Sequence, residues 1–130
     1  MHLIPPRSGE PSVRRTATFT GEVWADPVSS GEPTVNIVVF APGARTYWHR
    51  HHGGQLIIAS HGRGFVVRDD GGGGPVVAGQ SIWTPAGEMH WHGAGPDSVF
   101  AQTAYSFGTT EWLHEVLDEE YERAVQEASW

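Results

Sequence analysis

The sequence contains no cysteine, no lysine and no long apolar run. The lack of cysteine excludes disulfide bonds and thiolate metal ligands, and the lack of lysine excludes a Schiff base between a side chain and a carbonyl substrate. No stretch approaches the roughly 18 consecutive apolar residues of a membrane-spanning helix, and the first residues carry no apolar signal segment. We therefore expect a cytoplasmic protein that does not bind a membrane.

Basic residues are also few. The net charge is −7 at pH 7, and seven of the 15 acidic residues lie between Glu111 and Trp130, where Arg123 is the one base. The rest of the chain is close to neutral. Because binding to nucleic-acid phosphates requires a basic patch, we do not expect a nucleic acid as partner. The acidic segment is typical of a solvated helix face.

At 130 residues the chain has the length of one domain with a substantial core. Its 17 glycines and 9 prolines separate short runs of β-branched and aromatic residues, which is the pattern of short antiparallel strands joined by tight turns. The sequence therefore predicts an all-β sandwich or barrel over residues 16–110, with a hairpin tip at Gly71–Gly74. The predicted strands are Thr16–Trp24, Thr34–Phe40, Thr46–His51, Gln55–Ser60, Gly64–Arg68, Val76–Ala78, Ser81–Thr84 and Val99–Phe107.

The two ends of the chain depart from this strand pattern. Residues 1–15 are rich in Pro, Ser and Arg, and we expect them to form a flexible arm. From about Glu111 to Ala128 the apolar period becomes that of a helix, so residues 111–130 are predicted to hold a C-terminal acidic helix packed on the barrel. The predicted apolar face of this helix consists of Leu113, Val116, Leu117, Tyr121, Ala124, Val125 and Ala128.

Four residues form a candidate metal site. In an extended chain side chains alternate between faces, so His49 and His51 point the same way. Gln55 follows closely, and His90 lies in a second segment bounded by glycine and proline. Imidazole nitrogens and an amide oxygen suit Mn, Fe, Ni, Co or Zn. Because all four donors are neutral, a divalent ion would keep its full charge and act as a strong Lewis acid. The alternative is that these histidines are ordinary surface and turn residues.

His92 follows His90 by two residues, so both side chains should face the same cavity. A histidine with an ordinary pKa near neutrality is suited to general acid or base catalysis. The alternative is a buried histidine that is only hydrogen-bonded and packed.

Two segments resemble the paired motifs of the cupin family. Gly43, His49, His51, Gln55 and Gly62 resemble the first motif, and Gly79, Pro85, Ala86, Gly87 and His90 resemble the second. The resemblance implies a double-stranded β-helix, or jelly-roll barrel, with a divalent metal ion bound by His49, His51, Gln55 and His90. Two residues depart from the common pattern: Gln55 stands where most cupins have Glu, and Ala94 stands where Asn often closes the second motif.

Among cupins, the chain is most similar to small bacterial manganese-dependent hydroxynitrile lyases. That resemblance implies manganese as the first choice of metal and C–C cleavage of a cyanohydrin, with the substrate hydroxyl at the metal and His92 accepting its proton. Gln102 stands where characterised lyases carry a His that holds cyanide, so the resemblance makes it a candidate catalytic residue beside His92, and we expect at best weak lyase activity. The stretches that carry the similarity are Phe19–Gly21, Asp26–Pro27, Pro42–Thr46, Gly54–Gln55, Pro85–Glu88, His90–Ala94, Glu111–Trp112 and Asp118–Tyr121.

The resemblance also implies which residues surround a small-molecule substrate. Asn36 and Val38 alternate along one predicted strand whose face would line the pocket, and Asn36 could bind a substrate by a hydrogen bond. Thr46, Ser106 and Gln102 are further candidates for the pocket, each with the alternative of being a plain wall residue.

Other functions of the same barrel remain open. A cupin dioxygenase would need Fe or Ni with two open coordination sites, and a cupin isomerase or cyclase of sugar or polyketide metabolism would use the metal to polarise a carbonyl. A binding module without catalysis would not need His92. We also expect a homodimer, because a jelly-roll sheet leaves strand edges and an apolar outer face to be covered, with Thr16–Trp24 contributing to the interface.

Overall fold

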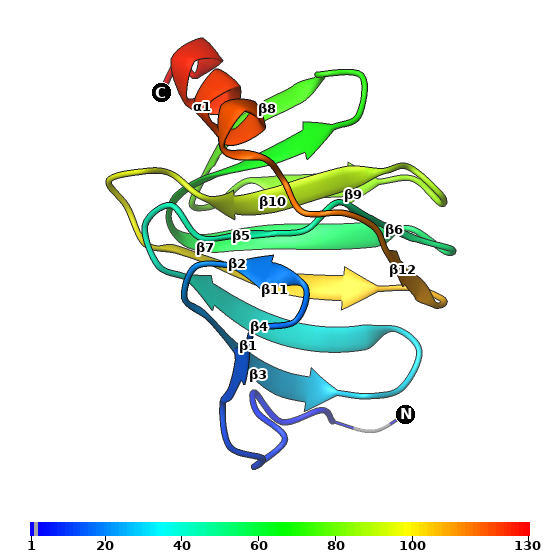
Figure 1. Cartoon of the computed structure of the whole chain (residues 1–130). Coiled ribbons are helices and arrows are strands. Elements are labelled where there is room, and N and C mark those ends of the chain that lie inside the picture. The colour runs from blue at the N-terminus through cyan, green and yellow to red at the C-terminus, as the bar shows by residue number, and fades with distance from the viewer. Residues whose placement is uncertain (2) are drawn as a thin grey trace.

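The computed structural model describes residue 1 and residues 3–130, and within them it has 12 strands and one helix (Figure 1). The elements are β1 (Val13–Arg15), β2 (Phe19–Thr20), β3 (Val23–Ser29), β4 (Thr34–Phe40), β5 (Arg45–Thr46), β6 (His49–His51), β7 (Gln55–Arg68), β8 (Gly73–Val77), β9 (Ser81–Thr84), β10 (His90–Ala94), β11 (Phe100–Ser106), β12 (Thr110–Trp112) and α1 (Asp118–Glu127).

The strands form a nearly closed antiparallel barrel in the order β1-β3-β4-β11-β7-β10-β5-β2, with β6, β8, β9 and β12 paired alongside. Strand β7 links the two halves, because its first half pairs with β11 and β9 and its second half pairs with β10 and β8. Helix α1 lies at the end of the molecule beside β8 (Figure 1). The prediction of an all-β barrel with a C-terminal helix is confirmed.

Two apolar clusters hold the barrel together. The larger cluster fills the interior with alternate residues of the strands, among them Phe40, Ile57 and Phe100, each fully buried. The second cluster lies under the helix, where Trp91 of β10 packs with Tyr121 of α1. The period-2 alternation of the strands therefore aims one set of side chains inward, and the few polar residues of that set form the candidate site.

Strand β10 was missed by the sequence analysis, although every one of its residues is buried. Its sequence of two histidines, a glycine and an alanine offers only Trp91 as a usual strand former. Gly93 explains part of how this strand packs, because a Cβ atom there would collide with the backbone of Ala44 and with Arg45 on β5. The absence of a side chain lets β10 lie directly against β5.

The predicted helix from Glu111 to Ala128 is too long at its start. Glu111 and Trp112 belong to β12, which pairs with β6, and the helix begins only at Asp118. Arg50 of β6 forms a two-point ion pair with Glu111, at 2.9 and 3.0 Å, across this strand pair. Leu117, predicted on the buried face, is the N-cap residue and is 48% exposed. In the described residues no helix is both long and apolar enough to cross a membrane.

The expected flexible arm over residues 1–15 is wrong for its last part. Val13–Arg15 forms β1, which pairs antiparallel with β3. Earlier in the segment, Arg7 pairs with Asp26 at 3.1 Å, and Ser8 donates a backbone hydrogen bond to Pro27. The composition of residues 1–15 predicted little regular structure, but the unpaired edge of β3 offers this segment backbone hydrogen-bond partners.

The helix is anchored to the barrel by buried polar contacts. The Tyr121 hydroxyl donates to the carbonyl of Ala94 at 2.8 Å, and the Arg45 guanidinium lies 4.7 Å from the centre of the Tyr121 ring. Arg45 also reaches Asp118 at 2.8 Å and the carbonyl of Val116. Burial raises the pKa of Tyr121 to about 12, so the hydroxyl stays a hydrogen-bond donor at all ordinary pH values.

Replacing Tyr121 with Phe should lower the free energy of unfolding by about 1 kcal/mol, because it removes one buried hydrogen bond and leaves a carbonyl without that donor. Urea unfolding at pH 7 measures the loss. Tyr105→Phe, which removes the same atom from a half-buried residue of β11, is the matched control and should change stability less. Equal losses in the two variants would contradict the anchoring role.

Candidate metal centre

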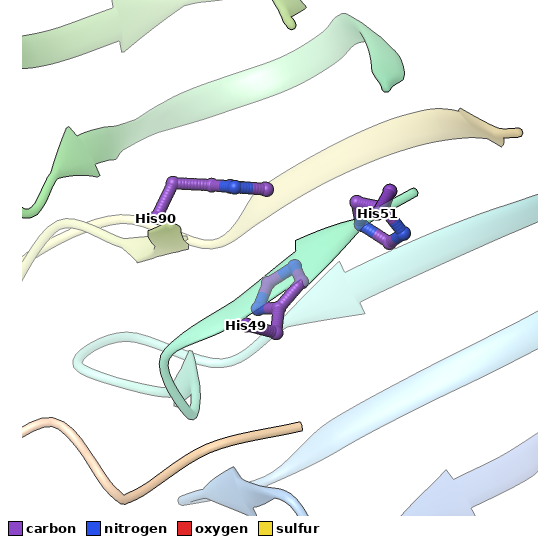
Figure 2. A group of neighbouring side chains, drawn as sticks. All are labelled: His49, His51 and His90. Atoms are coloured by element: carbon purple, nitrogen blue, oxygen red, sulfur yellow. The ribbon is translucent and has the colours of Figure 1, made fainter. Parts of the chain in front are cut away.

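Three buried histidines meet in the barrel interior. His49 and His51 lie two residues apart on β6 and point to one side, and His90 on β10 lies directly across from His49 in the strand pairing. Figure 2 shows the three rings converging from these two strands. One ring nitrogen from each residue lies within 4.8 Å of the other two. This geometry fits three ligands of one ion.

The orientation of two rings is fixed by backbone carbonyls. His49 Nδ1 lies 2.8 Å from the carbonyl of Tyr47, and His90 Nδ1 lies 3.0 Å from the carbonyl of Glu88. A carbonyl can only accept, so each Nδ1 carries the proton and each Nε2 keeps its lone pair. Metal-bound histidines are usually held in this way by their second nitrogen.

The third ring has a side-chain partner instead. His51 Nδ1 lies 2.9 Å from the Thr110 hydroxyl on β12, while its Nε2 is buried and has no hydrogen-bond partner in the described part of the protein. A buried polar atom without a partner is costly. A cation at the centre of the cluster would remove that cost.

Gln55, at the start of β7, adds an oxygen. Its amide nitrogen donates to the Ser106 hydroxyl at 3.0 Å, and its Oε1 lies 3.1 Å from His90 Nε2. Because the Nδ1 of His90 holds the proton, this contact brings two lone pairs together, which is unfavourable without a cation between them. The donor set of three imidazole nitrogens and one amide oxygen therefore fits a divalent metal ion.

The histidines are kept neutral by their surroundings. Burial lowers the pKa of His49 far below its ordinary value, and the neighbouring His90 lowers it further. Burial and then His90 lower the pKa of His51 to about 4, and burial lowers the pKa of His90. Neutral imidazoles offer lone pairs, so the site is prepared for a cation at neutral pH.

His92 lies beside the cluster with its ring 5.2 Å from that of His49. Its Nδ1 is 2.9 Å from the amide nitrogen of Gln102, and its Nε2 is buried with no partner among the described residues. Its backbone N–H donates to the Thr46 hydroxyl at 3.2 Å. Burial lowers the pKa of His92 far below its ordinary value, and His90 and His51 lower it further.

A cavity of about 340 Å³ opens above these residues. The four predicted pocket residues Asn36, Val38, Thr46 and Ser106 all line it, together with His49, His51, Gln55 and His92. Gln102 was expected to act directly in catalysis, but it is fully buried behind His92 and does not line the cavity. It can therefore act only through His92.

Two contributions to this cavity did not follow from the sequence. Trp112 of β12 packs against His49, with ring centres 4.6 Å apart, and it lies in the segment that was assigned to the helix. All residues of Val13–Phe19 line the cavity, although Val13–Arg15 was assigned to the flexible arm and Thr16–Phe19 to a strand with no part in the pocket. The run of β-branched residues Thr109–Thr110 before Glu111 was the one available signal for β12.

Comparisons with known proteins agree with this arrangement. A family model described as the cupin domain matches residues 36–99. The chain is 35% identical to an (R)-mandelonitrile lyase from Granulicella tundricola over 113 residues, which cover 81% of this chain and 86% of that protein.

Solved structures extend the likeness to the whole fold. A cupin-like protein from Thermotoga maritima has a TM-score of 0.86 and 34% identity, covering 92% of this chain and 98% of that one. A polyketide cyclase from Streptomyces resistomycificus has a TM-score of 0.70 at 20% identity, covering 94% and 92%; at this identity it shows the fold alone. With its paired motifs, its jelly-roll barrel and its three converging histidines, the chain belongs to the cupin superfamily.

Proposed function

We propose that this protein is a metal-dependent lyase that cleaves a cyanohydrin into a carbonyl compound and hydrogen cyanide. In this reaction the hydroxyl loses its proton, the C–C bond to the nitrile breaks with its electron pair leaving on cyanide, and a C=O bond forms. The proton finally joins the cyanide, so atoms and charge balance without any oxidant or reductant.

One observation carries the proposal: a donor set with no charged ligand lies at a small cavity, lined by three of its four members and by a histidine with a free ring nitrogen. His49, His51, His90 and Gln55 supply that donor set, and His92 supplies the free nitrogen. The similarity to an (R)-mandelonitrile lyase over most of both chains supports the same class of reaction.

We propose manganese as the metal, held by His49, His51, Gln55 and His90. A divalent ion there supplies Lewis-acid stabilisation to an oxygen of the substrate. Because the protein contributes no negative charge to the ion, the site should favour a substrate that brings an ionisable hydroxyl.

The role of His92 depends on Gln102. A half turn of the Gln102 amide presents its oxygen to His92 Nδ1, which then carries the proton and leaves a lone pair on Nε2. In that state His92 accepts the hydroxyl proton of the substrate at Nε2 and later returns it to cyanide. Gln102 is thus a positioning residue, since it selects which nitrogen of His92 carries the proton.

The walls of the cavity suit a small, partly apolar molecule. Val38 and Ala104 line one part of it, and the amide of Asn36 and the hydroxyl of Thr46 offer hydrogen bonds. Small-molecule sites commonly combine apolar walls with a few polar groups in this way. The polar groups would orient the substrate hydroxyl toward the donor set.

We expect about one divalent ion per chain in protein purified without chelators, measured by elemental analysis. Removing two of the four ligands in His49→Ala with His51→Ala should abolish binding. His61→Ala, which removes an exposed histidine of β7, is the control and should keep full occupancy. Metal-free wild-type protein, or equal occupancy in all variants, would refute the site.

Thr110→Val should weaken metal binding by about 10-fold or more. It removes the hydrogen bond that orients His51 but leaves all four proposed ligands in place. Competition with a coloured chelator measures the affinity. Thr109→Val is the matched control, since the neighbouring Thr109 hydroxyl lies 2.8 Å from Nδ1 of His52 rather than of a ligand. A similar loss in both variants would argue against an orienting role for Thr110.

His92→Ala should leave the metal content unchanged and lower turnover of mandelonitrile by roughly 10²–10⁴, the usual size of general acid–base catalysis. Formation of benzaldehyde, followed by absorbance, measures the rate, and denaturant unfolding measures stability. A loss of stability with an unchanged rate per folded molecule would make His92 a packing residue.

The lyase proposal itself fails if metal-loaded wild-type protein cleaves no cyanohydrin with Mn, Fe or Zn. Oxygen uptake by the Fe-loaded protein with a phenolic or enolic substrate would point instead to a dioxygenase. The metal centre would stand in either case, because the elemental analysis tests it separately.

A further inference from the structure

The N-terminal segment closes the barrel at the cavity. Strands β1 and β2 are the two ends of the sheet order, yet only Thr16–Thr18 separates them in the chain. β1 pairs with β3 on one side, and β2 pairs with β5 on the other. In Figure 1 the dark blue segment runs from β1 beside β3 to β2, which is drawn in front of β11. Every residue from Val13 to Phe19 lines the cavity.

Arg15 is the residue of this segment that brings charge to the interior. It lies directly across from Val23 of β3 in the antiparallel pairing, and paired residues place their side chains on the same face. Val23 is fully buried in the core, so Arg15 shares the inward face and is half-buried. Arg14 is also among the residues that line the cavity, but it lies across from Trp24, which is 41% exposed, so its side chain belongs to the outward face.

The charge around Arg15 is not balanced by the protein. No aspartate or glutamate is among the residues that line the cavity, although the chain has 15 acidic residues. The ion pairs found among the described residues involve Arg7, Arg45, Arg50 and Arg68, and none involves Arg15. Apart from Arg14, whose side chain lies on the outward face, the other polar residues that line the cavity are neutral. A half-buried guanidinium without a carboxylate in such a cavity is suited to bind an anion.

We propose that Arg15 binds a carboxylate of the substrate, while the reacting hydroxyl lies at the histidine cluster. The inference rests on the proposed function for the hydroxyl end and adds the other end of the molecule. The substrate class is then a cyanohydrin formed from an oxo acid, which carries both groups. The planar guanidinium matches a carboxylate with two parallel hydrogen bonds, and the partly apolar walls accommodate the carbon chain between the two ends.

A binding experiment tests this without any turnover. The probes are ω-hydroxy carboxylates of three to six carbons and the matching ω-hydroxy carboxamides, titrated calorimetrically into the protein as purified and after chelator treatment. We expect wild-type protein to prefer the carboxylate at one chain length. Arg15→Gln should weaken the binding of that carboxylate by about tenfold, the low end for a charge-assisted hydrogen-bonded pair. It should leave the affinity for the carboxamide unchanged. Arg15→Lys should restore part of the loss.

Arg123→Gln is the control for net charge, because it makes the same change on α1, away from the cavity. It should leave both probes unaffected. Equal affinity of wild-type protein for carboxylates and carboxamides, or an equal loss of both probes in Arg15→Gln, would overturn the proposal. A preference that persists in Arg15→Gln would also overturn it, because the carboxylate would then be bound elsewhere. Failure to cleave cyanohydrins would refute the lyase reaction and leave this binding result intact.

Discussion

The constraint on which the structure depends is the burial of several neutral imidazoles side by side. Each ring would be charged in acidic water, and charged rings this close would repel each other strongly. The barrel keeps them neutral by removing water, and backbone carbonyls fix the protons of His49 and His90 on the far nitrogens. The remaining lone pairs converge on one point, and a cation there relieves the contacts that the protein alone leaves unfavourable.

The rest of the fold can be understood as support for that arrangement. Strand β6 is paired on both sides, with β10 through His49 and with β12 through all three of its residues. The side chain of Thr110 on β12 reaches back to His51. The helix in turn is tied to β10 through Tyr121. A chain of directional contacts thus runs from the outer surface to the ligand nitrogens, which limits how far the rings can move.

The sequence predicted those parts of the site that depend on local geometry. The two-residue spacing of His49 and His51 puts both on one face of any extended strand, and the resemblance of the two motifs brought His90 and Gln55 to the same place. The resemblance also implied that the alternating face of β4, with Asn36 and Val38, lines the pocket. These inferences need only the backbone period and the two motifs of a known barrel.

The parts that the sequence did not predict depend on distant contacts. Strand β10 contains few strand formers and owes its existence to close packing against β5 and β7, which Gly93 permits. Val13–Arg15 is a strand only because the edge of β3 is free to pair with it. Trp112 continues an apolar pattern that is equally compatible with a helix, and the pairing with β6 decides the outcome. The local strand and helix propensities of these residues do not determine which element they form.

The cavity is therefore built from two groups of segments that differ in how well they tolerate amino-acid substitutions. The ligand strands β6, β7 and β10 are each paired on both sides, whereas β1 hydrogen-bonds to β3 alone. Substitutions in the first group disturb several strands at once, but those in Val13–Phe19 disturb few. Over evolutionary time, descendants of one ancestral barrel could keep the same ion and exchange this short stretch. Such a lineage would then vary mainly in its first twenty residues rather than in the two motifs that carry the metal ligands.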